Sequence, residues 1–560
     1  MKLYNKILSA LAMGSMVLAS CTDLDTFPQS GSFTEEQKQD VVSMLPERLA
    51  ADIVGMYSNN LQQFTVFGSK SGRGDDFGYP AVCLSNDLNG PDMVAPNNGY
   101  NWFSTCSEYS DRSDTYANPY MRWALFYNQI KMANDILNSI PDGTTDPTLL
   151  SYRGQAKAIR AFDYLNVAPY FQFKYKGNEE KPCIPLVTEE MAADPNNPRA
   201  TVQAVYDLII RDLTDAINDL EGYARKDKSE IDQKIAYGLR ARANLYMENW
   251  QAAADDAAKA MAGYTPYQRA ELTKPMFVSS DESGWMWALE ITEADYNADN
   301  SLISWPGVIG SFCEGSYSAG VGMYKSINVL LFNLISDTDV RKGWWVDENL
   351  HSDNLKGQSW RGLASGDDIA TLTVANQGKA AFLPYTNVKF GMYGGLGTNA
   401  AANDWPLMRV EEMILIQAEA TAMGGNPSDG KQILESFVKT YRDEQYSCKA
   451  SDAAGVQNAV WLQRRIELWG EGFSMADVMR LGRNVVRVKN GVATNFPDAY
   501  AFNVAADNGW LLMRIPQDET NANTGIPPAA NNSDGTMPKS GEGIGLTDGV
   551  INYLFNKMDI

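Results

Sequence analysis

Residues 406–425 read PLMRVEEMILIQAEATAMGG, and this stretch decides the fold of the 560-residue chain. Read as a helix, it is apolar around most of its circumference, so we expect it to be buried on all sides rather than laid on a surface. The alanines of AEATA allow neighbouring helices to approach closely. Its charged residues need partners or a path to water, because an unpaired buried charge is costly. These residues are Arg409, Glu411, Glu412 and Glu419.

The residues that follow predict a helical hairpin. Gly424 and Gly425 suit a left-handed C-terminal cap, and Asn426 and Pro427 suit the start of a second helix that runs to about residue 446. Other segments repeat the helical spacing of apolar residues. These predicted helices span residues 35–61, 120–140, 149–171, 201–220, 231–249 and 250–262, and residues 460–481 close the core.

One helical pair has a recognisable pattern. Residues 241–261, ARANLYMENWQAAADDAAKAM, resemble a tetratricopeptide hairpin, in which alanines let two helices cross closely. No strict 34-residue period is visible, so such repeats would be degenerate. The predicted fold class is therefore all-α, with tetratricopeptide-like helical hairpins forming one body, long irregular loops and little strand.

Two long regions do not follow the helical pattern. Residues 64–120 and 264–404 are rich in Gly, Asp, Asn and aromatic residues. Within the second region, WMWALEI at 285–291 has strand-like content, and residues 329–335 suggest a small helix. Loops of this length in compact domains are usually functional or disordered, and the aromatic residues argue against disorder.

Composition excludes several function classes. The formal net charge of −22 argues against nucleic acid or anionic lipid as the main partner. His351 is the one histidine, so a zinc site with several histidines is excluded, and a Ser-His-Asp triad would have to use it. The sequence indicates no cofactor and no metal site. After the N-terminal segment, no apolar run is long enough to span a membrane.

The N-terminus predicts export and lipidation. Lys2 and Lys6 precede an apolar run at residues 7–18, and Leu-Ala-Ser-Cys at 18–21 has the form of a bacterial lipobox. Cys21 is therefore the expected lipidation site, and a lipid anchor rather than a membrane span would hold the mature chain. Of the other five cysteines, Cys83 and Cys106 could form a bridge, but the sequence favours buried free thiols.

Several pieces, taken in one order along the chain, resemble the SusD/RagB family of lipid-anchored nutrient-binding proteins. The ordered set spans nearly the whole chain, although the KPCIP segment at 181–185 departs from the family pattern. The pieces are the lipobox with LDTFPQSGSFT (24–34), WALFYNQIKMANDIL (123–137), QAKAIRAFDYLNVAPYF (155–171), VYDLIIRDLTDAINDL (205–220), the hairpin at 241–261, MRVEEMILIQAEATA (408–422), RRIELWGEGFSMADVMRLG (464–482) and MRIPQDETNAN (513–523).

This resemblance implies a function as well as a fold. It implies a body of four tetratricopeptide-like units with irregular loops gathered on one side to hold the ligand. Family members bind oligosaccharides, and some bind peptides, and they deliver them to a SusC-like TonB-dependent transporter. Asp23 and Asp25 resemble the export signal that places such lipoproteins on the outer membrane, facing the exterior. The expected organisation is a signal peptide at 1–20, an N-terminal SusD-like helical region at 21–270, an aromatic loop-rich region at 271–405 and a C-terminal SusD/RagB helical region at 406–560.

A sugar site needs planar aromatic rings for the C–H face of the sugar, and Asp, Asn or Arg for its hydroxyls. Both loop regions contain these residue types, so we expect the site where the two regions meet. For each aromatic residue, the alternative is that it packs a loop onto the helical body. The candidate glycan-binding residues are Asp87, Asn101, Trp102, Tyr296, Trp305, Tyr317 and Tyr324.

Other charged residues are expected to be structural. The cluster Arg464, Arg465, Glu467 and Glu471 predicts an internal salt network with Glu411, Glu412 or Glu419. No pair of acids is marked for glycoside hydrolysis, so we expect no catalytic residues. A surface glycosidase, a peptide-binding member of the same family and a tetratricopeptide protein-interaction module remain as alternatives.

Overall fold

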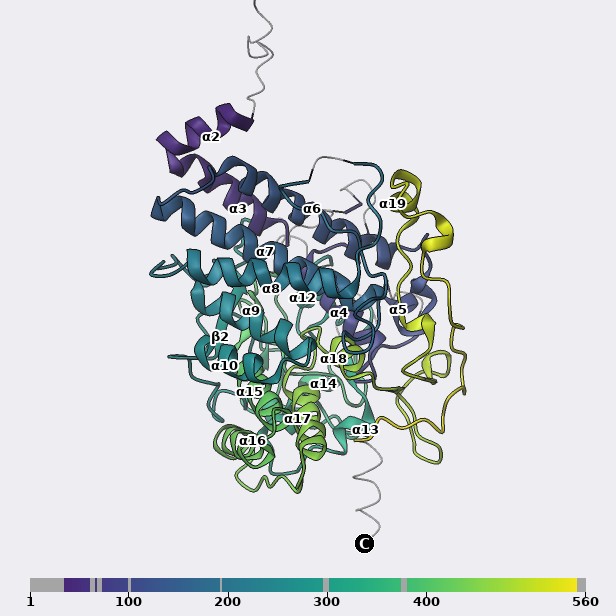
Figure 1. Cartoon of the computed structure of the whole chain (residues 1–560). Helices are drawn as coiled ribbons and strands as arrows, with labels where there is room; N and C mark the ends of the chain where they lie inside the picture. The colour runs from purple at the N-terminus through teal and green to yellow at the C-terminus, as the bar shows by residue number, and fades with distance from the viewer. Residues whose placement is uncertain are drawn as a thin grey trace, which may run out of the picture.

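The structure is a computed structural model, and it describes residues 35–60, 66–67, 73–98, 102–191, 194–295, 302–373 and 380–550. The predicted all-α class is confirmed. Helices make up most of the secondary structure in these ranges, and each sheet is a single pair of short strands (Figure 1).

The long helices form one continuous stack. Each helix packs on the next from α6 to α10, α15 then packs on α10, and both α16 and α17 pack on α15. Figure 1 shows this succession running down the molecule, with the C-terminal segment in yellow along one side. The helices of the stack are α6 (Ala117–Ser139), α7 (Pro147–Phe171), α8 (Val202–Asp219), α9 (Gln233–Tyr246), α10 (Trp250–Ala260), α15 (Val410–Met423), α16 (Pro427–Tyr441) and α17 (Ala453–Glu467).

Helix α15 is buried among α10, α16 and α17, as its apolar circumference predicts. The helix begins at Val410, however, and not at Pro406. Residues Trp405–Arg409 form strand β6, which pairs antiparallel with β2 (Trp285–Leu289). The residue before a proline is disfavoured in the helical region, and β2 offers a partner for the extended chain. The strand content predicted from WMWALEI is thus confirmed.

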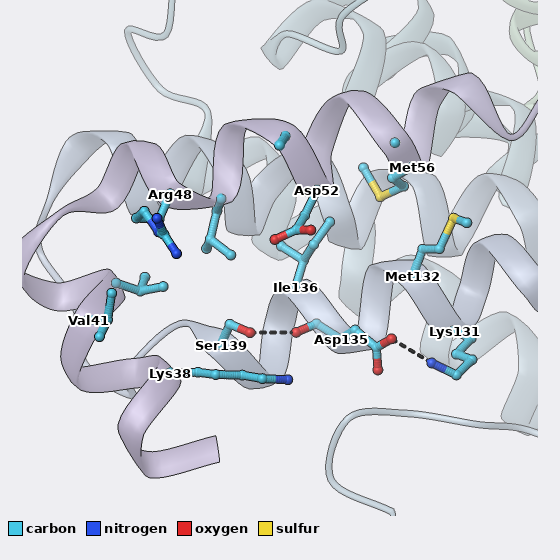
Figure 2. Close-up of a pocket in the computed structure, with 14 residues that line it drawn as sticks. Lys38, Val41, Arg48, Asp52, Met56, Lys131, Met132, Asp135, Ile136 and Ser139 are labelled. Atoms are coloured by element: carbon cyan, nitrogen blue, oxygen red, sulfur yellow. Dashed lines mark hydrogen bonds and ion pairs between the residues drawn. The ribbon is translucent and has the colours of Figure 1, made fainter. Parts of the chain in front are cut away.

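The predicted first helix, 35–61, is broken by Pro46. It forms α2 (Glu35–Met44), a 3-10 turn η1 (Pro46–Leu49) and α3 (Ala50–Ser58), because proline fits the start of a helix but not its interior. These elements lie across α6 and leave a groove of about 640 Å³ between them, shown in Figure 2. Its described lining is aliphatic and charged, without an aromatic ring.

The region between α10 and α15 is an insertion with its own small core. Some apolar residues between Phe312 and Ala401, such as Trp360 and Phe382, form a cluster separate from the main core, whereas others, such as Trp344 and Phe390, belong to the main core. Its elements are short. They are α12 (Trp305–Val308), β3 (Ser326–Ile327), α13 (Val329–Phe332), η3 (Val340–Trp344), η4 (Asp353–Leu355), β4 (Ser359–Trp360), β5 (Ala364–Ser365) and α14 (Asp368–Thr371).

The remaining elements flank the stack. Helix α18 packs on α4 and α7, which ties the C-terminal part of the chain to the N-terminal part. These elements are α4 (Tyr79–Asn89), β1 (Met93–Val94), α5 (Ser104–Glu108), η2 (Ser110–Arg112), α18 (Ser474–Leu481), β7 (Val485–Val486), η5 (Asp498–Tyr500), β8 (Asn503–Val504), η6 (Gly509–Leu511), α19 (Gln517–Ala522) and η7 (Pro528–Ala530).

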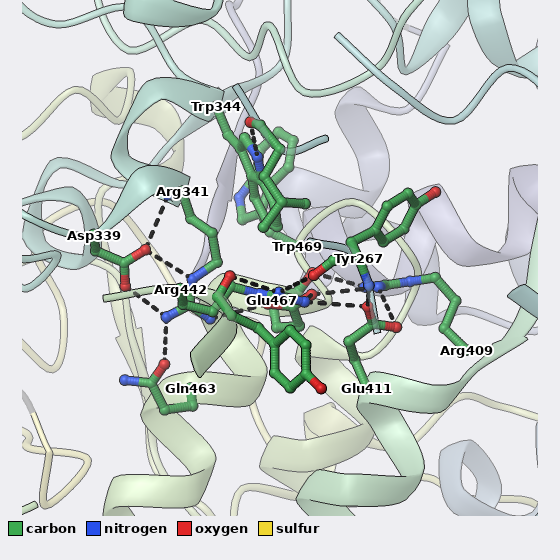
Figure 3. Close-up of polar contacts among 12 residues, drawn as sticks. Tyr267, Asp339, Arg341, Trp344, Arg409, Glu411, Arg442, Gln463, Glu467 and Trp469 are labelled. Atoms are coloured by element: carbon green, nitrogen blue, oxygen red, sulfur yellow. Dashed lines mark hydrogen bonds and ion pairs between the residues drawn. The ribbon is translucent and has the colours of Figure 1, made fainter. Parts of the chain in front are cut away.

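A buried charge network joins the stack to the insertion (Figure 3). Glu467, at the end of α17, accepts two hydrogen bonds from Arg442 (2.7 and 2.8 Å), one from Arg341 (3.0 Å) and one from Arg409 (3.3 Å). Glu411 pairs with Arg409 and Arg442 at 2.9 and 3.1 Å. Glu411 and Arg409 therefore have the charged partners that their burial requires.

The prediction for two of the arginines is wrong. Arg464 pairs with Asp477 at 2.7 Å, and Arg465 pairs with Asp92 and Asp548, so neither reaches the α15 glutamates. Glu412 is paired instead with Arg242, and Glu419 with Arg480. Arg464 and Arg465 lie in the last turn of α17, and carboxylates outside α15 are their partners there.

Cys83, Cys106, Cys183, Cys313 and Cys448 are all free and buried, in agreement with the favoured expectation. Among the helices in the described ranges, none is both long enough and apolar enough to cross a membrane.

Candidate functional site

The two aromatic loop regions meet. Strand β1 pairs antiparallel with β3, with Met93 opposite Ile327 and Val94 opposite Ser326. Beyond the strands, the Asn98 side chain donates to the carbonyl of Val321 at 3.3 Å. The first loop region is thereby fixed against the second, at the place where the sequence predicts a site.

An exposed aromatic pair lies at this junction. The Trp102 Nε1–H donates to the Tyr317 hydroxyl at 2.7 Å. Trp102 is 40% exposed, and no other tryptophan in the described residues is exposed to that extent. Since an indole N–H only donates, the Tyr317 hydroxyl acts as the acceptor, and its own proton remains available for a ligand.

A cation and a carboxylate flank this pair. The Arg73 guanidinium lies 4.7 Å from the Phe67 ring centroid and 5.6 Å from that of Trp102. It also donates two hydrogen bonds to Asp75, at 2.9 and 2.6 Å. The Arg73–Asp75 pair therefore carries almost no net charge. We call the group Phe67, Arg73, Asp75, Trp102 and Tyr317 the platform.

Gly74 is required for the platform geometry. A Cβ atom at this position would lie 2.6 Å from Trp102 Nε1 and 2.9 Å from the Tyr317 ring. The loop backbone can therefore approach both rings only when position 74 has no side chain.

We expect Gly74→Ala to push the indole away from Tyr317 and break their hydrogen bond, because the Gly74 backbone is buried whereas the indole is 40% exposed and can move more easily. A crystal structure of the variant measures the Nε1–hydroxyl distance, which should exceed 3.5 Å. Gly545→Ala, where a Cβ meets nothing within 4 Å, is the control. An unchanged distance in Gly74→Ala would contradict the expectation.

Three of the predicted glycan-binding residues are not at the surface. Asp87 is 1% exposed and accepts hydrogen bonds from the backbone N–H groups of Gly472 and Ser474, and burial raises its pKa to about 7. Trp305 is 2% exposed and donates to the carbonyl of Asn403, and Tyr324 is 1% exposed and packs on Phe382. Trp305 packs in the main core, Tyr324 in the core of the insertion, and Asp87 binds the backbone around the start of α18, so direct ligand contact by these three is not supported.

Three other predicted residues, Cys21, Asn101 and Tyr296, lie outside the described residues. Sequence reasoning missed Arg73 as a site residue. The available signal was its position in Gly-Arg-Gly-Asp-Asp at 72–76, where an arginine sits between two glycines and next to acidic residues.

A buried lysine supports the loop that carries Tyr317. Lys325 is 1% exposed, and its ammonium donates to the carbonyl of Met323 at 2.7 Å. Within the described part of the chain no carboxylate pairs with Lys325, and burial lowers its pKa to about 7. Between about pH 7 and its ordinary pKa of about 10.4, the unfolded chain binds a proton that the folded chain does not.

The free energy of unfolding is therefore expected to rise with pH across that window through Lys325. Lys325→Met should be more stable at pH 7, on the order of 1–3 kcal/mol, because the buried amine is removed. It should also show a flatter pH dependence. Urea unfolding at pH 6 to 10 measures both, and equal slopes in the variant and the parent would rule out this role of the amine.

Comparison with known proteins places the chain in a family. A model described as "Starch-binding associating with outer membrane" matches residues 81–245, and one described as "SusD family" matches residues 341–531. Together they cover more than half of the 560 residues. The chain belongs to the SusD/RagB family.

Solved structures agree with this assignment. A SusD-like carbohydrate-binding protein from Bacteroides vulgatus is 25% identical, with a TM-score of 0.69, over 86% of this chain and 97% of that one. A SusD superfamily protein from Bacteroides thetaiotaomicron is 19% identical, with a TM-score of 0.62, over 87% and 99%. A laminarin-binding SusD-like protein is 18% identical, with a TM-score of 0.57, over 85% and 97%. The last two show the fold alone. No curated protein matches the chain.

Proposed function

We propose that this protein is a lipid-anchored, outer-membrane protein on the cell exterior that binds an oligosaccharide or polysaccharide and delivers it, unchanged, to a SusC-like TonB-dependent transporter. The observation that carries the proposal is the platform, an exposed indole hydrogen-bonded to a tyrosine beside an arginine–carboxylate pair. A ring face for sugar C–H groups and polar groups for hydroxyls are what a glycan needs.

The family context supports two parts of this proposal, glycan binding and the outer-membrane location. One matching model is described as starch-binding and associated with the outer membrane, and the similar structures include a carbohydrate-binding protein and a laminarin-binding one. The lipobox at Cys21 supports the anchor. The net charge of −22 and the internal pairing of Arg73 favour a neutral glycan over an anionic one.

Affinity electrophoresis tests the proposal. In native gels containing neutral polysaccharides, laminarin and starch among them, we expect one or more to retard the protein. Incubation with the retarding polysaccharide should release no reducing sugar. Unretarded migration in every gel would contradict glycan binding, and released sugar would favour the glycosidase alternative.

One observation favours a second candidate, peptide binding. The groove between α3 and α6 is lined by the buried aliphatic residues Val42, Leu49 and Ile136. It is also lined by exposed charged residues, including Lys38 and Asp52, which Figure 2 labels. Such a groove suits a peptide or a helix from another protein. Two results together would favour this candidate. No polysaccharide would retard the protein in the gels, and the protein would bind peptides equally well with and without Trp102→Ala.

A further inference from the structure

A separate groove of about 540 Å³ lies on the insertion, beside α13, η3 and η4. Its volume is in the range of small-molecule sites. Unlike the groove beside α6, it combines rings with hydrogen-bonding groups of both kinds. The residues that matter are Phe332, Trp345, Glu348, His351, Asn354 and Tyr385.

Aromatic residues form one side of this groove. The rings of Phe332 and Tyr385 pack edge to face at 5.2 Å, and Trp345 lies beside them in the lining. Tyr385 has a φ of 68°, which is unfavourable for a bulky residue. Its carbonyl accepts from the Ile327 N–H of β3 at 3.0 Å, which holds this backbone in place.

The wall of the groove also contains unsatisfied donors. Trp345 Nε1 and Asn354 Nδ2 are buried and have no hydrogen-bond partner, although each side chain is only 1% exposed. A buried donor without an acceptor costs free energy. Neither atom is exposed in this structure, so a ligand hydroxyl or a bridging water molecule would accept from them only after a small shift of the groove wall.

The charges in the groove define the ligand further. Lys342 pairs with Asp337, and His351 pairs with Asp353 and Asp367. Glu348 and Asp347 remain, so the groove is acidic and disfavours an anion. Carboxylates need donors and the buried N–H groups need acceptors, and a sugar hydroxyl is both.

We propose that this groove is a second sugar-binding site, which takes a neutral sugar unit. This second proposal rests on the proposed glycan-binding function, to which it adds a site. Strand β3 connects the two sites, because Ile327 bonds to Tyr385 on one side and pairs with Met93 on the other, and β1 leads toward Trp102. One polysaccharide that engages both sites gains affinity without any new contact.

The test uses the full chain and the polysaccharide that retards it most in gels. The groove variant is Glu348→Ala with Asp353→Ala. Both residues are exposed, and the Asp353 carboxylate lies 3.8 Å from His351 Nε2, too far for a hydrogen bond, so it too is open to a ligand. The control, Asp368→Ala with Asp507→Ala, changes the net charge equally at exposed positions outside the groove. Titration calorimetry gives Kd for each protein and for Trp102→Ala.

We expect the groove variant to bind at least about tenfold more weakly, because hydrogen bonds to charged groups are lost, while the control binds like the parent. Trp102→Ala should keep residual binding that disappears when the groove variant is added to it. Parental affinity in the groove variant would overturn the second site alone. A parent protein that binds no polysaccharide would overturn both proposals.

Discussion

Replacing Glu467 with alanine is expected to lower the free energy of unfolding by about 3–5 kcal/mol, because the change strands buried positive charge. Glu467, Arg341 and Arg442 are all fully buried, and Arg409 is 2% exposed. Without the carboxylate, three guanidinium groups lose an acceptor in a place that water does not reach.

The pKa of Glu467 supports this expectation. Burial alone would raise it, but Arg442, Arg409 and Arg341 hold it well below its ordinary value. A carboxyl whose folded pKa is depressed stabilises the folded state above its unfolded pKa, and this contribution is lost as the pH falls toward the folded value. The parent should therefore lose stability below about pH 4 through this group, and Glu467→Gln should show a smaller loss.

Urea unfolding followed by circular dichroism measures the effect for Glu467→Ala and Glu467→Gln. The matched control is Asp135→Asn, which removes a carboxylate from the exposed pair with Lys131 on α6. Exposed pairs contribute about 0–1 kcal/mol, so this control should change little. If Glu467→Ala and Asp135→Asn lower the free energy of unfolding equally, the buried network does not stabilise the fold as we infer.

Replacing Trp102 with alanine is expected to weaken glycan binding at least about tenfold in Kd, with little change in stability. An exposed ring that contacts a ligand contributes mostly to binding, and truncating a central aromatic commonly costs about 2 kcal/mol. Because the indole also orients Tyr317 through their 2.7 Å hydrogen bond, the loss should exceed that of Tyr317→Phe.

Titration calorimetry with the retarding polysaccharide measures this loss. Tyr237→Ala is the control, since Tyr237 is a partly exposed aromatic residue on α9, with Lys259 lying 5.0 Å from its ring centroid, and has no part in the platform. Equal affinity in Trp102→Ala and Tyr237→Ala would remove the platform as the site, while glycan binding elsewhere on the protein would still be open to measurement.

Much of the helical body could be predicted because helical periodicity is a local property. The predicted helix at 149–171 is α7, Pro147–Phe171, and the one at 201–220 is α8, Val202–Asp219. The start of α15 could not be placed, because residues 405–409 are extended only through pairing with β2, more than a hundred positions earlier. Such a contact leaves no mark in the local pattern.

The site was less accessible to sequence reasoning. Trp102 and Trp305 both lie in aromatic loop regions, yet one is 40% exposed and the other 2%. Composition shows that a loop has rings, whereas the tertiary structure decides which rings face outward. Arg73 shows the same limit, since its place over Phe67 and Trp102 depends on how the loop folds.

The position of the insertion has a consequence for how the chain is made. Helix α10 ends at Ala260 and its next neighbour in the stack, α15, begins at Val410. During synthesis, the apolar side of α10 therefore stays without its α15 partner until the residues between these two positions have been made. Non-local closure of this kind slows folding and exposes the half-built chain to aggregation. A protein cut short before α15 should accordingly be degraded or precipitate rather than persist as a smaller working version.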